Sequence, residues 1–397
     1  MKRVLISFIG TGRKAEGEIS QEYEEAIYQF PDGSRYKSSL ITSTLYEYLK
    51  PDKIIILGTP NSIWAELSRM NPELLKKSKI YEEIWEETWD DSREVTEPSL
   101  SRWEKLLNNK LGVQIALNLI SKEAEDEIVE VIFKELPENI DEVYLDITHA
   151  FRHFPLTAAF ALPVLKYVKN FKRLTLIYAK LKAREISPVY FLTTPNKLLE
   201  LLEAVSNTKH SGNFSKFSAI YNTDLFSKVY LQAETNRPIS RKTISNLNSL
   251  VDTGKNVCQS IASVVIKRDV IPCLKGEYLE NRMANRAVFF AEKYQFLKAY
   301  TLIYEAIITA IIRKFYPNMS GNIDDINLRL KISKNLKDYF SSKDDKTISL
   351  TVRDIRNSIV HGSKPKSGQV ISALQNPEEL KYWVRKGKEL VDNLQKK

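Results

Sequence analysis

Strand and helix signals alternate along the first half of the chain and then stop, and this division constrains the fold more than any other feature. Apolar, β-rich runs with helical spacing between them predict strands at Val4–Ile9, Lys53–Leu57, Val143–Asp146, Leu174–Ala179 and Val189–Leu192. Strands separated by helices need crossover connections, so residues 1–195 are predicted to form an α/β Rossmann-like domain with a mostly parallel sheet. Within it, Tyr23–Lys37 predicts a hairpin, because Pro31-Asp32-Gly33-Ser34 separates two short Tyr-bearing segments.

From Pro195 onward the strand signals fade and nearly every segment has helical spacing. A length of 397 residues allows two or three domains. We therefore expect residues 196–397 to hold a helical linker region and an all-α C-terminal domain. Asn207–Asn213, rich in small and polar residues, is the expected linker.

Charge, cysteine content and hydropathy exclude several classes of protein. Residues 301–397 hold 18 basic and 11 acidic residues, against 41 and 39 in residues 1–300, so a polyanionic partner is expected at the C-terminal part. Cys258 and Cys273 have no Cys or His neighbour at ligand spacing, which predicts no disulfide framework, no metal site and a reducing, cytoplasmic location. The apolar stretch Ala306–Ile312 is far shorter than a membrane span, so no membrane association is expected.

A glycine-rich turn, Gly10-Thr11-Gly12-Arg13, directly follows the first predicted strand. Such a turn lets a ligand approach the backbone, and Arg13 can meet a phosphate. Together with Ala15 it formally satisfies the G-x-G-x-x-A dinucleotide fingerprint, which keeps a nicotinamide-dependent enzyme open as an alternative. That fingerprint needs a helix starting at the glycines, whereas a hairpin is expected here.

A second loop, from Asp146 to Pro155, follows the strand Val143–Asp146. Carboxyl ends of parallel strands meet at one edge of a sheet, so the two loops are expected to share a rim. A hydroxyl, an imidazole and a guanidinium suit phosphate and ribose, and an aromatic ring suits a base; a lone His149 could instead cap the helix. The candidate ligand contacts are Gly10, Thr11, Gly12, Arg13, Thr148, His149, Ala150, Phe151 and Arg152, with Thr59 and Asn61 from the break after the second strand.

The basic C-terminal part contains Arg356-Asn357-Ser358-Ile359-Val360-His361. Helical geometry places His361 nearly opposite the apolar stripe Val352, Ile355 and Ile359, in the last turn before a probable terminating Gly362. His361 could merely neutralise a helix end. Arginine and histidine together are nonetheless a minimal set for metal-free RNA cleavage. In one helix Arg356 and His361 lie about 140° apart, which favours a cleft between two symmetric helices over one pocket.

With these motifs the sequence resembles the CARF–HEPN ribonucleases, ancillary enzymes of type III CRISPR antiviral defence. The resemblance implies a homodimer whose CARF domains bind a cyclic oligoadenylate, with cyclic tetra-adenylate favoured, and so activate a metal-independent HEPN endoribonuclease that cleaves single-stranded RNA. It implies no cofactor, a catalytic role for Arg356, Asn357 and His361, and ligand binding by the glycine turn and the loop at 148–152. Ala150 stands where the family usually has glycine. The alternative is a nucleotide-sensing module without nuclease activity that recruits a partner.

Overall fold

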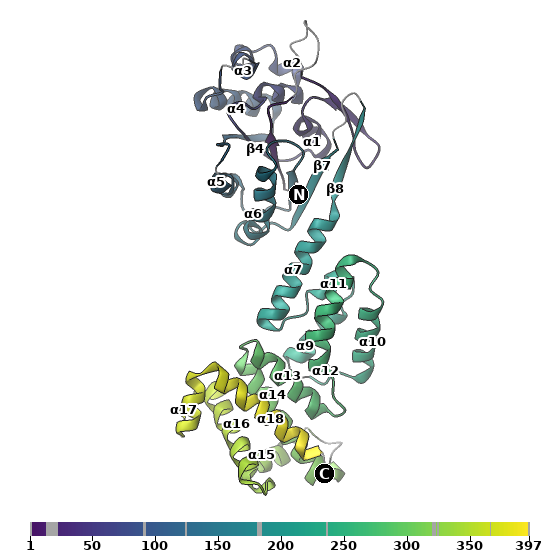
Figure 1. Cartoon of the computed structure of the whole chain (residues 1–397), viewed down its shortest axis with the longest axis vertical. Coiled ribbons are helices and arrows are strands. Elements are labelled where there is room, and N and C mark those ends of the chain that lie inside the picture. Colours follow the sequence, from purple (N-terminus) through teal and green to yellow (C-terminus); the bar gives the residue numbers. More distant parts are fainter. Residues whose placement is uncertain are drawn as a thin grey trace. The chain divides into compact units, whose positions relative to one another are not determined.

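The computed structural model describes residues 2–12, 23–89, 93–123, 125–180, 185–235, 237–319, 323, 325–365 and 367–395. The chain divides into two compact units, Met1–Asn196 and Lys197–Lys397 (Figure 1).

The N-terminal unit is built on one eight-stranded sheet with the order β3-β2-β8-β7-β6-β1-β4-β5. Strand β1 lies inside the sheet and pairs in parallel with β4 and β6, and parallel pairs also join β4 to β5, β6 to β7 and β2 to β8. The pairs β2–β3 and β7–β8 are antiparallel. The predicted α/β fold with a mostly parallel sheet is therefore confirmed. The strands are β1 (Arg3–Ile9), β2 (Ala26–Gln29), β3 (Arg35–Ser38), β4 (Lys53–Gly58), β5 (Gln114–Leu119), β6 (Glu142–Asp146), β7 (Arg173–Ala179) and β8 (Ile186–Leu192).

Helices cover both faces of this sheet. Alternate residues of a strand face opposite sides: Leu5 packs in a core with Leu45 and Trp103, whereas the ring of Phe8 lies 6.2 Å from that of Phe154. The first face carries α1 (Ile41–Leu49), the 3-10 helix η1 (Trp64–Met70), α2 (Pro72–Leu75), α3 (Lys79–Trp89) and α4 (Glu97–Leu111), and the second carries α5 (Glu125–Glu135) and α6 (His153–Lys169).

Two local expectations have different outcomes. The hairpin is confirmed: β2 and β3 pair around Pro31–Ser34, with Tyr28 opposite Tyr36. Strand β5 was not predicted. Its sequence, Gln-Ile-Ala-Leu-Asn-Leu, has one β-branched residue and several helix-compatible ones, so only its pairing along β4 defines it as a strand.

In its described residues the second unit is built from helices. The expected linker Asn207–Asn213 is wrong for the most part, because α7 continues to Ser211: Thr208 is buried there, and its hydroxyl donates to the Ala204 carbonyl at 2.8 Å. The elements are α7 (Thr193–Ser211), α8 (Phe217–Ile220), α9 (Leu225–Glu234), α10 (Arg241–Asp252), α11 (Val257–Val265), the π-helical turn η2 (Ile266–Val270), α12 (Ile271–Leu274), α13 (Leu279–Glu292), α14 (Phe296–Phe315), η3 (Pro317–Met319), α15 (Ile326–Lys334), η4 (Leu336–Tyr339), α16 (Lys343–His361), α17 (Gly368–Gln375) and α18 (Pro377–Gln395).

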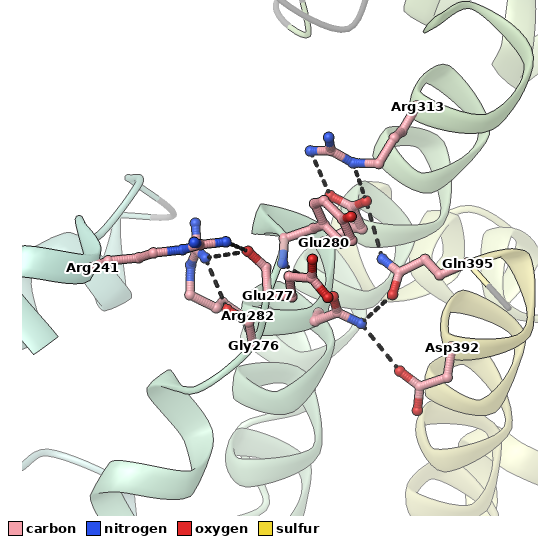
Figure 2. A network of polar contacts seen from close by, with 10 residues as sticks. Arg241, Gly276, Glu277, Glu280, Arg282, Arg313, Asp392 and Gln395 are labelled. Atoms are coloured by element: carbon pink, nitrogen blue, oxygen red, sulfur yellow. Dashed lines mark hydrogen bonds and ion pairs between the residues drawn. The ribbon is translucent and has the colours of Figure 1, made fainter.

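A polar network joins three of the packed helices, α13, α14 and α18 (Figure 2). The carboxylate of Glu280 is fully buried and accepts hydrogen bonds from Arg313 Nε at 2.5 Å and from Gln395 Nε2 at 3.1 Å. Asn281 donates to Gln395 Oε1 at 2.7 Å, so the end of α18 is tied to the start of α13. A buried carboxylate is tolerated only when it is paired in this way, so the network specifies how these helices meet.

Candidate functional site

The loops that follow β1, β4 and β6 lie at one edge of the sheet. In the sheet, β1 lies between β4 and β6. The chain therefore adds β4 and β5 on one side of β1 and β6 on the other, and the helices that connect these strands cover opposite faces of the sheet. This reversal opens a crevice at the carboxyl ends of the strands, where open α/β sheets bind their ligands.

A cavity of about 470 Å³ occupies this crevice. Gly10, Thr11, Gly12, Thr59, Thr148, His149, Ala150 and Phe151 of the predicted ligand set line it. Arg152 is exposed just before α6 and does not line it, and neither does the half-buried Asn61. Arg13 lies outside the described residues.

Two buried hydroxyls fix the loops around the cavity. Ser7 Oγ donates to Asp146 at 2.7 Å, and Asp146 also accepts from the backbone N–H of Thr148 at 2.9 Å. Ser62 Oγ donates to the Ile9 carbonyl at 2.8 Å and accepts from the Thr59 N–H at 2.9 Å. The loops after β1, β4 and β6 are therefore bonded to one another or to neighbouring strands, which gives the site a rigid frame.

At Ala150 the backbone turns directly beside the glycine loop. Its φ is 77°, a left-handed conformation that L-residues rarely adopt. A Cβ on Gly10 would lie 3.3 Å from the Ala150 nitrogen, so the two loops approach through their backbones. Since α6 starts three residues later, backbone N–H groups and the positive end of a helix converge at this edge, and both attract anions.

Two ionisable groups lie in and beneath the cavity wall: Asp146 is fully buried, and His149 is half-buried with its Nε2 atom covered. Burial raises the pKa of the Asp146 carboxyl, and burial lowers the pKa of the His149 imidazole. Among the described residues His149 Nε2 is buried and makes no hydrogen bond. His149 is thus held as a neutral imidazole with a ring nitrogen free for a ligand.

The sequence did not reveal the part of the wall that comes from the β2–β3 region. Glu24, Glu25, Tyr28 and Ser39 line the cavity from there. A hydrogen bond from Lys37 lowers the pKa of Glu25, which therefore presents a charged carboxylate, while Ser39 donates to the buried Glu66. The hairpin itself was predicted, but no local pattern indicates that β2 pairs with β8 and so reaches this edge.

Aromatic rings support the opposite rim. A Cβ on Gly12 would lie 2.8 Å from Tyr23 Cδ1, so glycine is required for this contact. The Tyr23 ring lies edge-on to Trp89 at 5.4 Å, and Trp89 stacks on Trp85 at 5.4 Å. Behind Thr59, Trp64 Nε1 donates to the Thr59 carbonyl at 2.9 Å.

The second candidate site lies at the end of α16. Arg356 Nη1 donates to Asn357 Oδ1 at 3.0 Å and to His361 Nε2 at 2.8 Å. Gly362 has a φ of 61° and ends the helix, as predicted, and the apolar stripe expected for this helix packs inward, with Val352 and Ile355 fully buried. An arginine can only donate, so the imidazole accepts through Nε2 and carries its proton on Nδ1.

Within this one helix Arg356 and His361 are in contact, although the angle between them favoured a cleft between two helices. The long arginine side chain bends along the helix end and spans the 140° between the two positions. Its guanidinium carbon lies 5.4 Å from the centre of the Tyr304 ring on α14, and the Tyr304 hydroxyl is 2.7 Å from Ser333 Oγ. The motif's geometry is therefore no argument for a second helix.

Over the part of the chain that the structure describes, three or more His, Cys, Asp or Glu side chains nowhere gather closely enough to hold a metal ion. Within the same residues, every helix is too short or too polar to cross a membrane.

Comparisons with known proteins find similarity to CRISPR-associated proteins. The CRISPR-associated protein MJ1674 of Methanocaldococcus jannaschii is 30% identical over 238 residues, which is 54% of this chain and 37% of that protein, so the chain spans little more than a third of its relative. A solved structure described as Enterococcus italicus Csm6 bound to cyclic hexa-2′-fluoro-hexa-dAMP aligns with 100% of this chain and 95% of its own, at 10% identity and a TM-score of 0.41. Residues 4–185 match the family described as CRISPR system endoribonuclease Csx1, CARF domain. Over nearly its whole length, the N-terminal unit is therefore similar to the CARF domain of the Csx1 endoribonucleases.

Proposed function

We propose that this chain acts as a homodimer in type III CRISPR defence, binding a cyclic oligoadenylate in its N-terminal unit and then cleaving single-stranded RNA in its helical unit. One observation carries the proposal. The residues that match the Csx1 CARF domain, 4–185, include every residue that lines the cavity at the carboxyl ends of β1, β4 and β6.

The chemistry of the cavity suits an adenine nucleotide. The carboxylates of Glu24 and Glu25 can accept from the exocyclic amine of adenine, and the half-exposed ring of Phe151 can stack on a base. Backbone N–H groups of the glycine turn and the start of α6 can hold phosphate oxygens, with Arg152 at the rim as a charged partner. We propose cyclic tetra-adenylate as the preferred ring.

In the helical unit, Arg356, Asn357 and His361 supply the groups for RNA cleavage without a metal. A phosphate that draws the Arg356 guanidinium toward itself frees His361 Nε2, which takes the proton of the 2′-hydroxyl. The 2′-oxygen then bonds to phosphorus, the bond from phosphorus to the 5′-oxygen of the next nucleotide breaks, and the His361 imidazolium returns its proton to that oxygen. One product therefore ends in a 2′,3′-cyclic phosphate and the other in a 5′-hydroxyl. Arg356 stabilises the developing negative charge, and Asn357 positions Arg356.

The test is an RNA-cleavage assay on the full chain in excess chelator, with cyclic rings of three, four and six adenylates compared. We expect cleavage that depends on a ring and is fastest with four adenylates, and no cleavage by His361→Ala. His210→Ala is the matched control, because His210 also lies in the last turn of a helix of this unit. Ring binding without cleavage would favour the sensing module that recruits a partner, and cleavage only after magnesium is added would exclude the metal-free mechanism.

A further inference from the structure

Three arginines, Arg241, Arg282 and Arg286, gather near the start of α13 and form an arginine cluster. Arg241 Nη2 donates to the Glu277 carbonyl oxygen (Figure 2). Arg282 Nη1 donates to the same oxygen at 3.3 Å and to the Gly276 carbonyl oxygen at 3.0 Å. One turn further along the helix, Arg286 Nε donates to the Arg282 carbonyl oxygen at 3.3 Å. Each of these acceptors is a neutral main-chain oxygen, so the bonds leave three positive charges unbalanced.

The acidic side chains at the start of α13 are engaged elsewhere. The buried Glu280 carboxylate is paired with a fourth arginine, Arg313, whose Nε lies 2.5 Å from it. The Glu277 carboxylate accepts a hydrogen bond from the Tyr278 hydroxyl, and this bond raises the pKa of Tyr278. Over the described ranges, no arginine of the cluster forms an ion pair with an Asp or Glu side chain. The cluster therefore lacks a counter-charge.

Two guanidinium nitrogens of the cluster are buried without a partner. Arg282 Nε and Arg286 Nη1 have no hydrogen-bond partner within the residues that the structure describes, and Arg286 is 2% exposed. Burial lowers the pKa of both residues, to about 10 for Arg286, and the charge of Arg241 adds to the shift at Arg282. Buried charge without a counter-charge is unfavourable. An anion bound here would therefore stabilise the folded protein.

Arg241 opens the cluster to the solvent. It is the first residue of α10 and is exposed, whereas Arg282 is half-buried. The two side chains bond to one carbonyl oxygen, so both guanidinium groups lie within reach of one ligand (Figure 2). A guanidinium group binds phosphate through two parallel N–H bonds, and a phosphate has enough oxygens to accept from two such groups.

The arginine cluster is separate from the candidate catalytic site. Arg313, whose charge acts on Arg282, follows Tyr304 by nine residues on α14. Nine residues correspond to about two and a half turns, so the two side chains leave opposite sides of the helix. Tyr304 supports Arg356. A phosphate bound at the cluster is therefore not the one that is cleaved.

We propose that Arg241, Arg282 and Arg286 form a binding site for a phosphate group, carried by an RNA strand or by a small nucleotide. Arg241 and Arg282 contact the phosphate, and Arg286 contributes its charge from behind them. The bound phosphate ties the start of α10 to the loop before α13 and so stabilises the helical unit. The site rests on the arginines alone, whereas RNA as the source of the phosphate rests on the proposed function.

The first test is a thermal melt of the full chain in sodium phosphate and in sodium chloride of equal ionic strength. Phosphate should raise the Tm of the wild type roughly 2–4 °C more than that of Arg241→Gln or Arg282→Gln. Arg385→Gln is the matched control and should respond like the wild type, because Arg385 is a half-exposed arginine of the same unit that pairs with Glu292. Equal responses in all four proteins overturn the proposal.

A charge reversal keeps the test independent of misfolding. Arg241→Glu places a carboxylate beside Arg282, so its Tm without phosphate should exceed that of the wild type and its response to phosphate should shrink. Lys242→Glu is the control, since it also adds an acid to the first turn of α10, where the helix dipole favours one. A larger gain for Arg241→Glu supports the site. Equal gains, with an undiminished response to phosphate, contradict it.

Two ligands distinguish the sources of the phosphate, both measured in the His361→Ala background so that RNA stays intact. If RNA carries it, Arg241→Gln should weaken binding of a single-stranded RNA with hydroxyl ends at least about tenfold. The slope of log K against log salt should then fall by about 0.7, the value for one phosphate contact of a single strand. If a small nucleotide carries it, Arg241→Gln should instead weaken binding of adenosine 5′-monophosphate and leave the RNA affinity unchanged.

The outcomes separate this site from the proposed function. If Arg241→Gln changes the affinity for neither ligand, the site is refuted, whatever the RNA-cleavage assay shows. If phosphate stabilises the wild type through Arg241 and Arg282 but the chain neither binds nor cleaves RNA, the proposed function is refuted and the phosphate site stands.

Discussion

At Ala150 an L-residue occupies a left-handed conformation, which costs about 1–2 kcal/mol relative to the ordinary regions. Glycine has no such penalty, although its freedom in the unfolded chain offsets part of the gain. We expect Ala150→Gly to raise the free energy of unfolding by up to about 1 kcal/mol in urea denaturation. Ala159→Gly, inside α6, should lower it by about 1 kcal/mol. If Ala150→Gly and Ala159→Gly lowered the free energy of unfolding by the same amount, the backbone at Ala150 would not be strained.

The pKa of His149 beside the buried Asp146 predicts a pH effect on stability with a definite sign. The unfolded chain protonates His149 near pH 6.5, but burial lowers the pKa of His149 in the folded chain, so the unfolded state binds more protons and stability falls as the pH drops. His149→Gln removes this loss.

Thermal melts at about pH 7.5 and about pH 5.5 test this prediction, because these values lie on either side of the ordinary histidine pKa. The wild-type chain should lose more stability over this interval than His149→Gln. Asn246→Gln, a change at an exposed residue of α10, serves as the control and should follow the wild-type profile. Parallel profiles for the wild type and His149→Gln would mean that His149 titrates equally in the folded and unfolded states.

At the scale of elements, the contact between α14 and α16 fixes Arg356. The Tyr304 ring supports the guanidinium, and the Tyr304 hydroxyl holds Ser333. Tyr304→Phe keeps the ring and should retain most RNA cleavage, whereas Tyr304→Leu loses the attraction between cation and ring, about 0.5–2 kcal/mol, and should cleave roughly two- to thirty-fold more slowly. Single-turnover rates measure the difference. Equal rates in the two variants would exclude the ring as a support for Arg356.

The sequence predicted elements better than it predicted the contacts between them. Glycine turns and the Asp146 loop are local signals, and they correctly pointed to one sheet edge, since parallel strands align their carboxyl ends. Glu25 and Tyr28 were missed because strand pairing between β2 and β8 joins residues about 160 positions apart, and no local pattern specifies such a partner. The angle of about 140° between Arg356 and His361 favoured a cleft between two helices, but an angle between Cα positions does not measure how far the long arginine side chain reaches along the helix end.

At the scale of the whole molecule, the candidate ligand site and the candidate catalytic site lie in different compact units. His361→Ala should therefore abolish RNA cleavage and leave the affinity for cyclic oligoadenylate unchanged. Arg152→Ala should lose a charge-assisted hydrogen bond of about 1.5–3 kcal/mol and raise the activator requirement roughly ten- to a hundred-fold, with cleavage restored at saturation. Titration calorimetry and activator dose curves measure both. Normal cleavage by His361→Ala, with none by Arg152→Ala at saturating activator, would place the nuclease in the N-terminal unit.

The aromatic rim of the cavity gives the unlabelled protein an optical signal. Gly12 lies close to the Tyr23 ring, which contacts the stacked pair Trp85 and Trp89. The Trp64 indole donates a hydrogen bond to the Thr59 carbonyl. Indole emission responds to the polarity and hydrogen bonding around the ring, and Gly12 and Thr59 line the cavity. We therefore expect a ligand in the cavity to change the tryptophan emission, so that a titration can be followed by emission spectroscopy in wild-type protein, with neither dye nor radiolabel.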